Sequence, residues 1–343
     1  MEIRPITTVE DLEERLSRPN GADVAWAARL QGDIAVIGAS GKIGPSLARR
    51  VKRASDQAGA RRRVLAVAAD LGAGAGDELA AAGIEPVECD CLDRHALDRL
   101  PAIPNVLYLV GRKFGTEGRS DLTWAINTLA AAHVADRFRD SRIVVFSSGN
   151  LYGMVPPAGG GSRETDTPAP VGEYAQSCLG RERVVEYFSR ERGTRCLFFR
   201  LNYAVDLRYG VLMDIGRRVF EGRPIDLRVG CANVIWQGDA SSYAFRSLGL
   251  ADSPPRILNV TGSELVGVRE LAEWFGRRLG RAPLFDGSEG EVALLSNASP
   301  CHAALGPPEI GLPLLREWAA AWIETGGPSL DKPTHYEVAD GRY

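Results

Sequence analysis

Short apolar runs alternate with longer amphipathic segments through the first two thirds of the chain. Runs rich in Val, Ile, Leu and Ala at 34–37, 64–68, 87–89, 106–110, 143–146 and 196–200 predict strands. The segments at 43–54, 78–82, 121–139 and 173–190 lie between these runs and predict helices. Strands that are apolar on both faces and separated by helices are typical of a parallel sheet covered on both sides. The pattern therefore predicts an α/β fold with a doubly wound, Rossmann-like parallel sheet.

The two ends of the chain follow a different pattern. Residues 1–32 contain one amphipathic helical segment, around 9–16, and predict an N-terminal helical extension. Beyond about residue 205 the alternation loosens, and helical segments at 268–279 and 314–325 are joined by connections rich in Pro and Gly. We therefore expect the Rossmann-like domain to span 33–205. A smaller α/β lobe, which binds substrate and closes over the strand ends, should span 206–343, with some of its segments free to rejoin the main sheet.

Composition narrows the class of protein. The chain has 343 residues, of which 45% are apolar, so it can bury a sizeable core. Its formal net charge is −3. Proteins that bind nucleic acid or anionic membrane surfaces usually carry net positive charge, so neither partner is expected. No apolar run approaches the ~18 residues that cross a bilayer, and the first sixteen residues contain no signal-peptide core. We expect a cytoplasmic enzyme.

The six cysteines do not form a metal-binding or disulfide pattern. They lie at 89, 91, 178, 196, 231 and 301, without a C-x-x-C pair and without neighbouring histidines. A zinc site or a disulfide framework would need closer and more regular spacing. We therefore predict no metal, and we expect most of these residues to be buried apolar side chains.

A glycine-rich turn directly follows the first predicted strand. The chain reads Gly-Ala-Ser-Gly-Lys-Ile-Gly over 38–44, so glycines recur every three residues between a strand and a helix. Glycines there permit the tight turn, the approach of a diphosphate to the backbone and close packing of helix on strand. The N–H groups at the start of the helix then face the phosphate charge. The spacing predicts a dinucleotide site at Gly38, Ser40, Gly41, Lys42, Ile43 and Gly44.

The residues after the second and third strands bear on the choice of cofactor. An acidic residue after the second strand suits the ribose 2′-hydroxyl of NAD, whereas a basic residue suits the 2′-phosphate of NADP. Asp70 follows the run at 64–68 and favours NAD, and Lys42 in the glycine turn favours NADP. Asp90 follows the third strand, next to Cys91, and is expected near the adenine amino group. NAD is the expected cofactor and NADP the alternative.

In this order and spacing, several short motifs resemble the extended short-chain dehydrogenase/reductase family, in its NAD-dependent epimerase/dehydratase branch. The likeness runs from about residue 33 to 325. It includes the glycine turn, Asp-Cys-Leu-Asp at 90–93, Asn127, Ser-Ser-Gly-Asn-Leu-Tyr-Gly at 147–153, Tyr174 and Asn-Val-Thr-Gly at 259–262. The resemblance implies a nicotinamide cofactor in contact with Val110, Gly111 and Ser147, and a sugar-like substrate. It also implies a homodimer that pairs the helices at 121–139 and 173–190.

In that family a Ser or Thr, a Tyr, and a Lys four residues after the Tyr carry the chemistry. Ser148 and Tyr174 match the first two. A serine at the end of a strand and a tyrosine on the next helix can converge on one substrate hydroxyl, where the tyrosine exchanges the proton and nicotinamide the hydride. Cys178 stands where the family has its lysine.

The replacement of the lysine leaves the mechanism open. A neutral thiol cannot lower the pKa of a tyrosine, or bind ribose hydroxyls, as an ammonium does. Lys113, after the fourth strand, is the preferred substitute, although Arg112 and Lys113 can equally be solvated loop charges; Arg181, seven residues after Tyr174, is a weaker one. The protein can use another cation, use Tyr174 only as a proton donor, or lack redox activity.

Two departures from the family narrow the reaction and the substrate. The 4,6-dehydratase branch has Asp-Glu beside its active-site Ser or Thr, where this chain has Gly149 and Asn150. The family's diphosphate-binding arginine aligns near Ala232 or Asn233, so a nucleotide diphosphate loses its bidentate partner and a simpler sugar or polyol is favoured. The candidate substrate contacts are Asn150, Asn202, Tyr203 and Trp236.

These observations predict an NAD(P)-dependent oxidoreductase or epimerase that acts on a hydroxyl of a sugar or polyol. Tyr174 transfers the proton, Ser148 orients the hydroxyl, and Lys113 supplies positive charge beside Cys178. Two alternatives remain, because the lysine is missing. One is a redox-inactive regulatory protein that binds NAD(H), and the other is a lyase or isomerase that uses the same pocket without redox chemistry.

Overall fold

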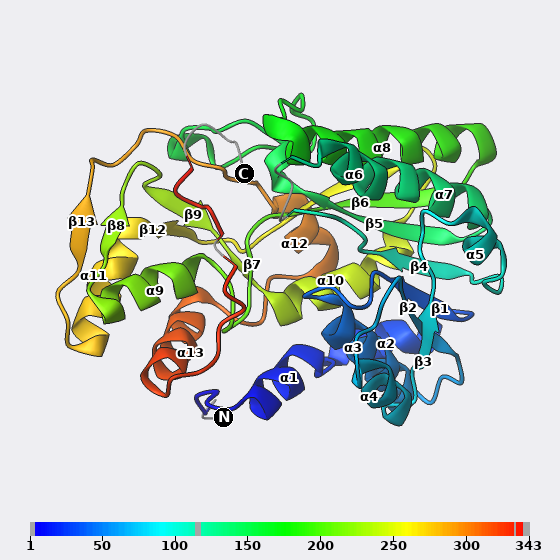
Figure 1. Ribbon diagram of the computed structural model, residues 1–343, viewed down its shortest axis with the longest axis horizontal. Coiled ribbons are helices and arrows are strands. Elements are labelled where there is room, and N and C mark those ends of the chain that lie inside the picture. The colour runs from blue at the N-terminus through cyan, green and yellow to red at the C-terminus, as the bar shows by residue number, and fades with distance from the viewer. Residues whose placement is uncertain (1–3, 114–117, 333, 339–343) are drawn as a thin grey trace.

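The computed structural model describes residues 4–113, 118–332 and 334–338. A sheet domain and a smaller lobe lie side by side (Figure 1). The sheet domain contains a single seven-stranded sheet in which every neighbouring pair of strands is parallel. In spatial order the strands are β11 (Arg256–Val260), β6 (Arg195–Leu201), β5 (Arg142–Ser148), β4 (Asn105–Tyr108), β1 (Ile34–Ile37), β2 (Val64–Ala68) and β3 (Glu85–Glu88).

This strand order confirms the predicted doubly wound fold. The chain moves from β1 outward to β2 and β3, then crosses back to β4 on the other side of β1. Ligands of open α/β sheets bind at the carboxyl ends of the strands where the order reverses, here between β1 and β4. β11 lies far beyond residue 205 in the sequence, yet it extends the sheet next to β6. The C-terminal half of the chain thus returns to the main sheet.

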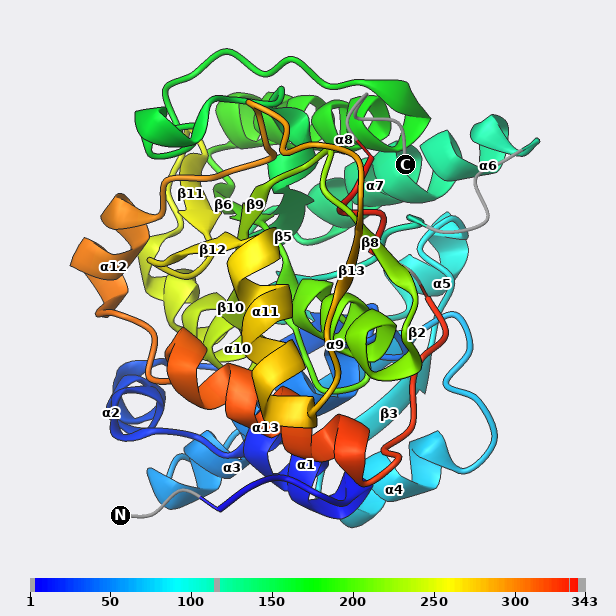
Figure 2. The ribbon, with the colours of Figure 1, turned by 90° about the vertical axis from the view of Figure 1, so that its left-hand side faces the viewer.

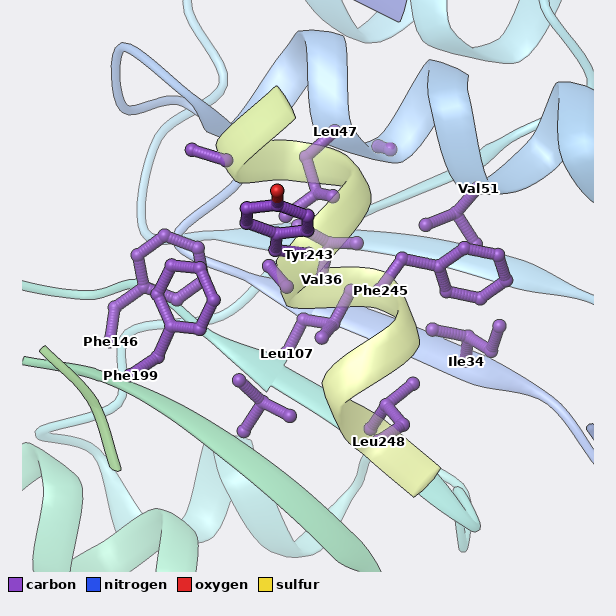
Figure 3. Packing of buried hydrophobic residues seen from close by; sticks show 14 of the residues in the cluster. Ile34, Val36, Leu47, Val51, Leu107, Phe146, Phe199, Tyr243, Phe245 and Leu248 are labelled. Atoms are coloured by element: carbon purple, nitrogen blue, oxygen red, sulfur yellow. The ribbon is translucent and has the colours of Figure 1, made fainter. Parts of the chain in front are cut away.

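Helices cover both faces of the sheet (Figure 1). One apolar core lies between the sheet and α2 (Gly21–Arg29), α3 (Gly44–Gln57), α4 (Ala75–Ala81), α10 (Gln237–Ser247) and α12 (Ser299–Leu305). Figure 3 shows part of this core, in which Tyr243 and Phe245 of α10 pack above Val36 and Leu107 of the sheet. The second core lies under α5 (Arg94–Asp98), α7 (Ala130–Arg137) and α8 (Gly172–Arg192). Burial on both faces explains why these strands have continuous apolar sequences.

The smaller lobe has its own core. It is formed by α1 (Val9–Ser17), α9 (Val211–Glu221), α11 (Val268–Leu279) and α13 (Leu312–Glu324), which lie close together (Figure 2). Its buried side chains include Phe275, Trp318 and Trp322. Three two-stranded sheets complete the lobe. They pair β7 (Ala204–Val205) with β10 (Ile235–Trp236), β8 (Pro224–Asp226) with β13 (Leu284–Asp286), and β9 (Cys231–Asn233) with β12 (Leu265–Gly267).

The N-terminal segment is part of both cores rather than an appendage on one domain. Leu12 and Leu16 of α1 are buried in the core of the lobe, whereas Ala27 of α2 is buried under the sheet. A fully buried ion pair between Asp23 and Arg50, with a distance of 2.7 Å from Oδ2 to Nε, attaches α2 to α3. The first residues therefore connect the two parts of the molecule.

The helix predicted over 121–139 departs from regular geometry. It begins as α6 (Ser120–Trp124), continues through a π-helical segment (Ala125–Leu129), and ends as α7 at Arg137. The π-helical segment contains Asn127, whose side chain is fully buried and faces the sheet domain. β4 ends at Tyr108, two residues earlier than predicted, so that Val110 and Gly111 belong to the turn after it. Within the described residues, no helix is long and apolar enough to cross a bilayer.

Candidate active site

A cavity of about 360 Å³ lies at the carboxyl ends of the central strands, between the sheet domain and the lobe. Its wall contains many of the residues singled out from the sequence, namely Gly41, Lys42, Ile43, Gly111, Lys113, Ser147, Ser148, Asn150, Tyr174, Asn202 and Tyr203. The sequence did not single out the other lining residues as candidates, apart from Arg181 as a weak one. These are Leu109, Phe146, Arg181, Leu201, Ala204, Tyr209, Gly210, Leu330, Lys332 and Thr334.

The glycine turn forms the phosphate end of this site. The turn connects β1 to α3. The backbone of Gly38 has a φ of 94°, a conformation that residues other than glycine rarely adopt. A Cβ atom at Gly38 would lie 2.8 Å from the Val110 nitrogen, and one at Gly44 would lie 2.6 Å from the Ala39 Cα. Only glycine allows this close packing of turn, helix and strand. The exposed turn at the start of a 14-residue helix fits the diphosphate of a dinucleotide.

The two acidic residues predicted for the adenosine end follow neighbouring strands. Asp70 comes just after β2 and is exposed, and its Oδ1 accepts a hydrogen bond from the Gly72 N–H at 2.7 Å. Asp90 comes after β3, and its Oδ1 accepts from the Leu92 N–H at 2.9 Å. Cys91 is buried in the core beneath α5 and α7. Asp70 and Asp90 thus lie at the same edge of the sheet, on the β2 side of the glycine turn.

Lys42 points away from this adenosine end. Its Nζ donates to the Ala204 carbonyl at 2.9 Å and lies 4.2 Å from the centre of the Tyr209 ring. Both partners belong to the segment that begins the lobe. The Lys42 side chain therefore extends across the cavity, toward the lobe and not toward β2, where a 2′-phosphate was expected. Burial lowers its pKa to about 8, while Asp206 raises it.

Ser148 and Tyr174 converge as the sequence predicts. Ser148 is the last residue of β5, and Tyr174 lies in the first turn of α8. Their side chains are hydrogen-bonded to each other, and the Ser148 Oγ also accepts from the Asn150 N–H at 3.1 Å. Ser147 faces the same cavity and donates to Glu182 at 2.6 Å. Serine and tyrosine can therefore meet one ligand hydroxyl.

Cys178 lies one helical turn after Tyr174, fully buried and outside the cavity wall, with its thiol hydrogen-bonded to the tyrosine. Burial raises the pKa of Tyr174 far above its usual value, and the Cys178 thiol raises it further. The guanidinium of Arg181 and the hydrogen bond with Ser148 act in the opposite direction and lower this pKa. Burial likewise raises the pKa of Cys178. Both shifts favour the neutral forms of the phenol and the thiol.

Lys113 lines the cavity and is not a solvated loop charge. It follows β4 and lies close enough to Cys178 and Asp214 for both to favour its charged form. Burial is the larger influence and lowers the pKa of Lys113 to about 8. The structure thus places Lys113 in the same cavity as Ser148 and Tyr174.

The substrate side is formed mainly by residues of the lobe. Asn202 donates to Asn233 at 3.0 Å, and Tyr203 adopts a left-handed backbone with a φ of 42°. The Asn150 Nδ2 is buried in the cavity wall and has no hydrogen-bond partner among the described residues. Trp236, expected to contact substrate, is instead part of the lobe core, where its ring centre lies 5.4 Å from that of Trp318. That prediction is wrong because β10 pairs with β7 and turns the indole inward.

The C-terminal segment after α13 contributes to the wall, which no pattern in the sequence predicts. Leu330, Lys332 and Thr334 line the cavity. The Leu330 N–H donates to the Arg208 carbonyl at 3.0 Å, and the Thr334 hydroxyl donates to Asp214 at 2.5 Å. In Figure 1 this segment crosses from the lobe toward the sheet domain. The described residues contain no group of three or more His, Cys, Asp or Glu side chains that could hold a metal ion.

Solved structures with the same fold include several sugar-nucleotide epimerases. UDP-glucuronic acid 4-epimerase from Bacillus cereus, in complex with NAD, superposes with a TM-score of 0.71 at 15% identity, covering 85% of this chain and 96% of its own. UDP-glucose 4-epimerase from Thermotoga maritima, with UDP-glucose, has a TM-score of 0.68 at 17% identity, covering 86% and 99%. The Thermus thermophilus UDP-glucose 4-epimerase, in complex with NAD, has a TM-score of 0.67 at 19% identity, covering 85% and 99%.

Sequence comparison gives the family. No curated protein matches this chain in sequence. The model of the NAD dependent epimerase/dehydratase family matches residues 34–205, which run from the first strand through the glycine turn, Ser148 and Tyr174 to β7. The chain therefore belongs to the NAD-dependent epimerase/dehydratase family of enzymes.

Proposed function

We propose that the protein oxidises and reduces a hydroxyl-bearing carbon of a sugar-like substrate, as an oxidoreductase or as an epimerase that restores the hydroxyl after transient oxidation. One observation carries the proposal: the glycine turn, Ser148 and Tyr174 all line one cavity. This arrangement can hold a dinucleotide and a hydroxyl against the same tyrosine. The family and the structural neighbours support this reaction class.

Ser148 and Tyr174 would handle the proton. The Ser148 hydroxyl donates to the substrate oxygen and holds it beside the phenol. Tyr174, as a phenolate, takes the proton from the hydroxyl while the carbon loses its hydride, and returns the proton when the carbonyl is reduced. The nicotinamide, when bound, accepts and returns that hydride. The phenolate needs a nearby positive charge, for which we propose Lys113 as one source.

The cofactor is proposed to be NAD. The exposed carboxylate of Asp70 follows β2, where it suits a ribose 2′-hydroxyl and repels a 2′-phosphate. Lys42 lies on the opposite side of the glycine turn. Structural neighbours in complex with NAD support the same choice.

The substrate is proposed to carry a negative charge. Three of the four lysines in the chain, Lys42, Lys113 and Lys332, line the cavity together with Arg181. No carboxylate belongs to the described lining residues. The neighbours' substrates, UDP-glucose among them, are anionic. Ala232 and Asn233 stand near the position of the family's diphosphate-binding arginine, and Asn233 instead bonds Asn202 and Ser296. A sugar acid or sugar phosphate is therefore favoured over a nucleotide sugar.

We also infer a homodimer in which helices of two subunits pair. Trp124, Leu129 and Tyr187 are exposed apolar side chains on α6, the π-helical segment and α8, with exposed fractions of 37%, 49% and 61%. A mass of twice the 37.0 kDa of one chain, measured by light scattering, would support this arrangement, and the mass of a monomer would contradict it.

The six cysteines are all buried and unpaired, which supports a reducing cytoplasmic location.

Two other functions keep a specific observation in their favour. Cys178 in place of the lysine favours a redox-inactive protein that senses NAD(H). The same neutral pair of Tyr174 and Cys178 also suits a lyase or isomerase that needs a proton donor but no hydride transfer. Both alternatives predict ligand binding without reduction of the cofactor.

The test is a panel of sugars, sugar acids and sugar phosphates incubated with purified protein and NAD. Absorbance near 340 nm reports net oxidation, and chromatography of the sugars reports epimerisation. We expect one or the other, with a loss of at least about tenfold in Tyr174→Phe, or about 1.4 kcal/mol of barrier. Glu191→Gln, at an exposed position near the end of the same helix, is the control. Turnover at the wild-type rate in Tyr174→Phe would overturn the mechanism, and NADH binding without any product would favour the sensor.

A further inference from the structure

Arg181 occupies a position that the chemistry of the site leaves unfilled. It lies seven residues after Tyr174 on α8, which is nearly two full helical turns, so it shares a helix face with Tyr174 and Cys178. The side chain is only 4% exposed, yet it forms part of the cavity wall. Figure 1 shows α8 beside α6 and above the strands of the sheet. The guanidinium reaches the carbonyl of Phe146, near the end of β5.

Three hydrogen bonds fix the guanidinium in place. Its Nε donates to the Asn127 carbonyl at 2.9 Å, its Nη2 donates to the Asn127 Oδ1 at 3.0 Å, and its Nη1 donates to the Phe146 carbonyl at 2.6 Å. The acceptors come from the π-helical segment and from the end of β5. A guanidinium has five N–H groups, so two remain after these three bonds within the described part of the chain. These N–H groups can donate to hydroxyl or phosphate oxygens of a ligand.

The charge of Arg181 is buried without a carboxylate partner among the described residues. The neighbouring acid, Glu182, is paired with Arg200 at 2.6 Å and accepts from Ser147. A buried charge that only neutral carbonyls and amides stabilise is costly for the fold. The unneutralised charge is instead available to an anion in the cavity, and Tyr174, whose phenolate is such an anion, lines the same cavity.

Gly111 leaves room for the guanidinium. A Cβ atom on Gly111 would lie 2.8 Å from the Arg181 Nη2, so any residue larger than glycine would displace the guanidinium. The thiol of Cys178 is uncharged and short. A lysine at 178 would bring a second positive charge against the first on the same helix face. The thiol at 178 and the guanidinium at 181 therefore form one compatible pair.

We propose that Arg181 is the cation that stabilises the Tyr174 phenolate and takes over the part of the absent lysine. The inference rests on the proposed function, since it concerns the same tyrosine. Arg181 keeps its own protons throughout. The substrate hydroxyl gives its proton to the phenolate oxygen, and the guanidinium balances the negative charge before that transfer. Lys113 then serves chiefly to attract the anionic part of the ligand.

The test compares Arg181→Met, Arg181→Lys, Cys178→Lys and the double variant Cys178→Lys/Arg181→Met. Arg183→Met, which removes an exposed arginine from the same helix, is the control for loss of charge. Thermal melting first establishes that each variant folds. Acidity of the phenol is then measured without any cofactor, by ¹⁹F NMR of protein that carries difluorotyrosine at position 174, which ionises within the accessible pH range.

We expect the phenol to become at least about tenfold less acidic in Arg181→Met and unchanged in Arg183→Met. The double variant should recover most of the loss, because the new lysine then replaces the guanidinium. NADH affinity, measured by fluorescence, should fall at least about tenfold in Arg181→Met and recover in the double variant. Arg181→Lys keeps the charge but not the planar fork of the guanidinium. Its phenol acidity and its NADH affinity should therefore lie between those of wild type and those of Arg181→Met.

Wild-type acidity of the phenol in a folded Arg181→Met protein would overturn the proposal, whatever the enzyme does. If Arg181→Met does not fold, the double variant decides instead. A phenol that is no more acidic in the double variant than in Arg181→Lys would also overturn the proposal. Failure of wild-type protein to bind NADH would instead defeat the proposed function, and the cofactor-free titration would still report on Arg181. The two failures are thereby distinguishable.

Discussion

Lys42 and Lys113 illustrate how single side chains set the pH range of this site. Both line the cavity, and burial lowers the pKa of each to about 8. Below that pH both ammonium groups are charged and favour an anionic ligand. As the pH rises through about 8 they lose their protons, and the attraction decreases.

This argument predicts that the affinity for a sugar phosphate decreases as the pH is raised from 6.5 to 9.5. Lys113→Met should weaken binding about fivefold at pH 7, or about 1 kcal/mol, and should flatten the pH dependence because one titrating group is gone. Calorimetric titration measures both. Lys52→Met is the control, because Lys52 pairs with Asp56 on α3 outside the cavity. Equal affinities of Lys113→Met and wild type at every pH would contradict the prediction.

At this scale the sequence predicts residues whose chemistry depends on local spacing. The glycine turn, Ser148 and Tyr174 each sit at the junction of a strand and a helix, and such junctions are readable from the apolar pattern. The role of Arg181 is harder to predict, because helical spacing gives its face but not its depth or its bonds to Asn127. Trp236 was expected to contact substrate but lies in the core of the lobe. A tryptophan in a strand as short as β10 has the same sequence pattern whether it faces a cavity or a core.

Among the elements, the π-helical segment (Ala125–Leu129) has the strongest influence on the site. Besides Arg181, the Asn127 side chain in the widened turn bonds three groups, which belong to Arg112 and Ser177. The Asn127 Oδ1 accepts from the Arg112 N–H at 2.7 Å, and its Nδ2 donates to the Arg112 carbonyl at 3.1 Å and to the Ser177 hydroxyl at 2.8 Å. The Asn127 amide thus connects the π-helical segment with the turn after β4 and with α8. π-Helical turns of this kind frequently occur at functional sites.

Asn127→Leu should therefore destabilise the protein by about 2 kcal/mol or more, because the Arg112 N–H and the Arg181 Nη2 lose a buried acceptor. Urea denaturation measures the change in unfolding free energy. Ser120→Ala, at an exposed position of the adjoining α6, should change it by less than about 0.5 kcal/mol. A comparable loss in both variants would show that the segment matters as a helix and not through the amide.

The predictability of elements follows their length. Six of the seven strands of the sheet were predicted to within a few residues, because most of them contain three or more buried apolar residues in succession, whereas β11 was not predicted as a strand. The paired strands of the lobe are two or three residues long, too short for any periodicity to appear. The π-helical segment was predicted as ordinary helix, since one extra residue per turn hardly changes an apolar pattern of this length.

At the scale of the whole molecule, long-range contacts cross the boundaries that the sequence predicts. β11 completes the sheet from beyond residue 250, and the segment around Leu330 closes the cavity of a domain that begins near residue 33. Neither contact leaves a local signal, because both depend on where the intervening chain folds. The contact between α10 and the loop before α13 is a third example, since the Asp239 Oδ2 accepts from the Ile310 N–H at 2.9 Å.

This last contact makes stability depend on pH. Burial raises the pKa of Asp239 from its ordinary 3.8 to about 6, against the lowering effects of the Ile310 N–H and Arg50. The folded protein thus holds a proton that the unfolded chain releases between pH 3.8 and 6. The stabilisation is fully present below that window and is lost as the pH rises through about 6, with an upper limit of about 3 kcal/mol.

Asp239→Asn removes the charge while its amide oxygen can still accept from the Ile310 N–H. We expect the variant to be more stable than wild type at pH 8 by about 1–3 kcal/mol, and to show no advantage near pH 4. Thermal melting across this range, with Glu10→Gln as a surface control, measures the difference. A variant that is less stable than wild type at pH 8 would mean that the ionised carboxylate stabilises the folded state, which would contradict the prediction.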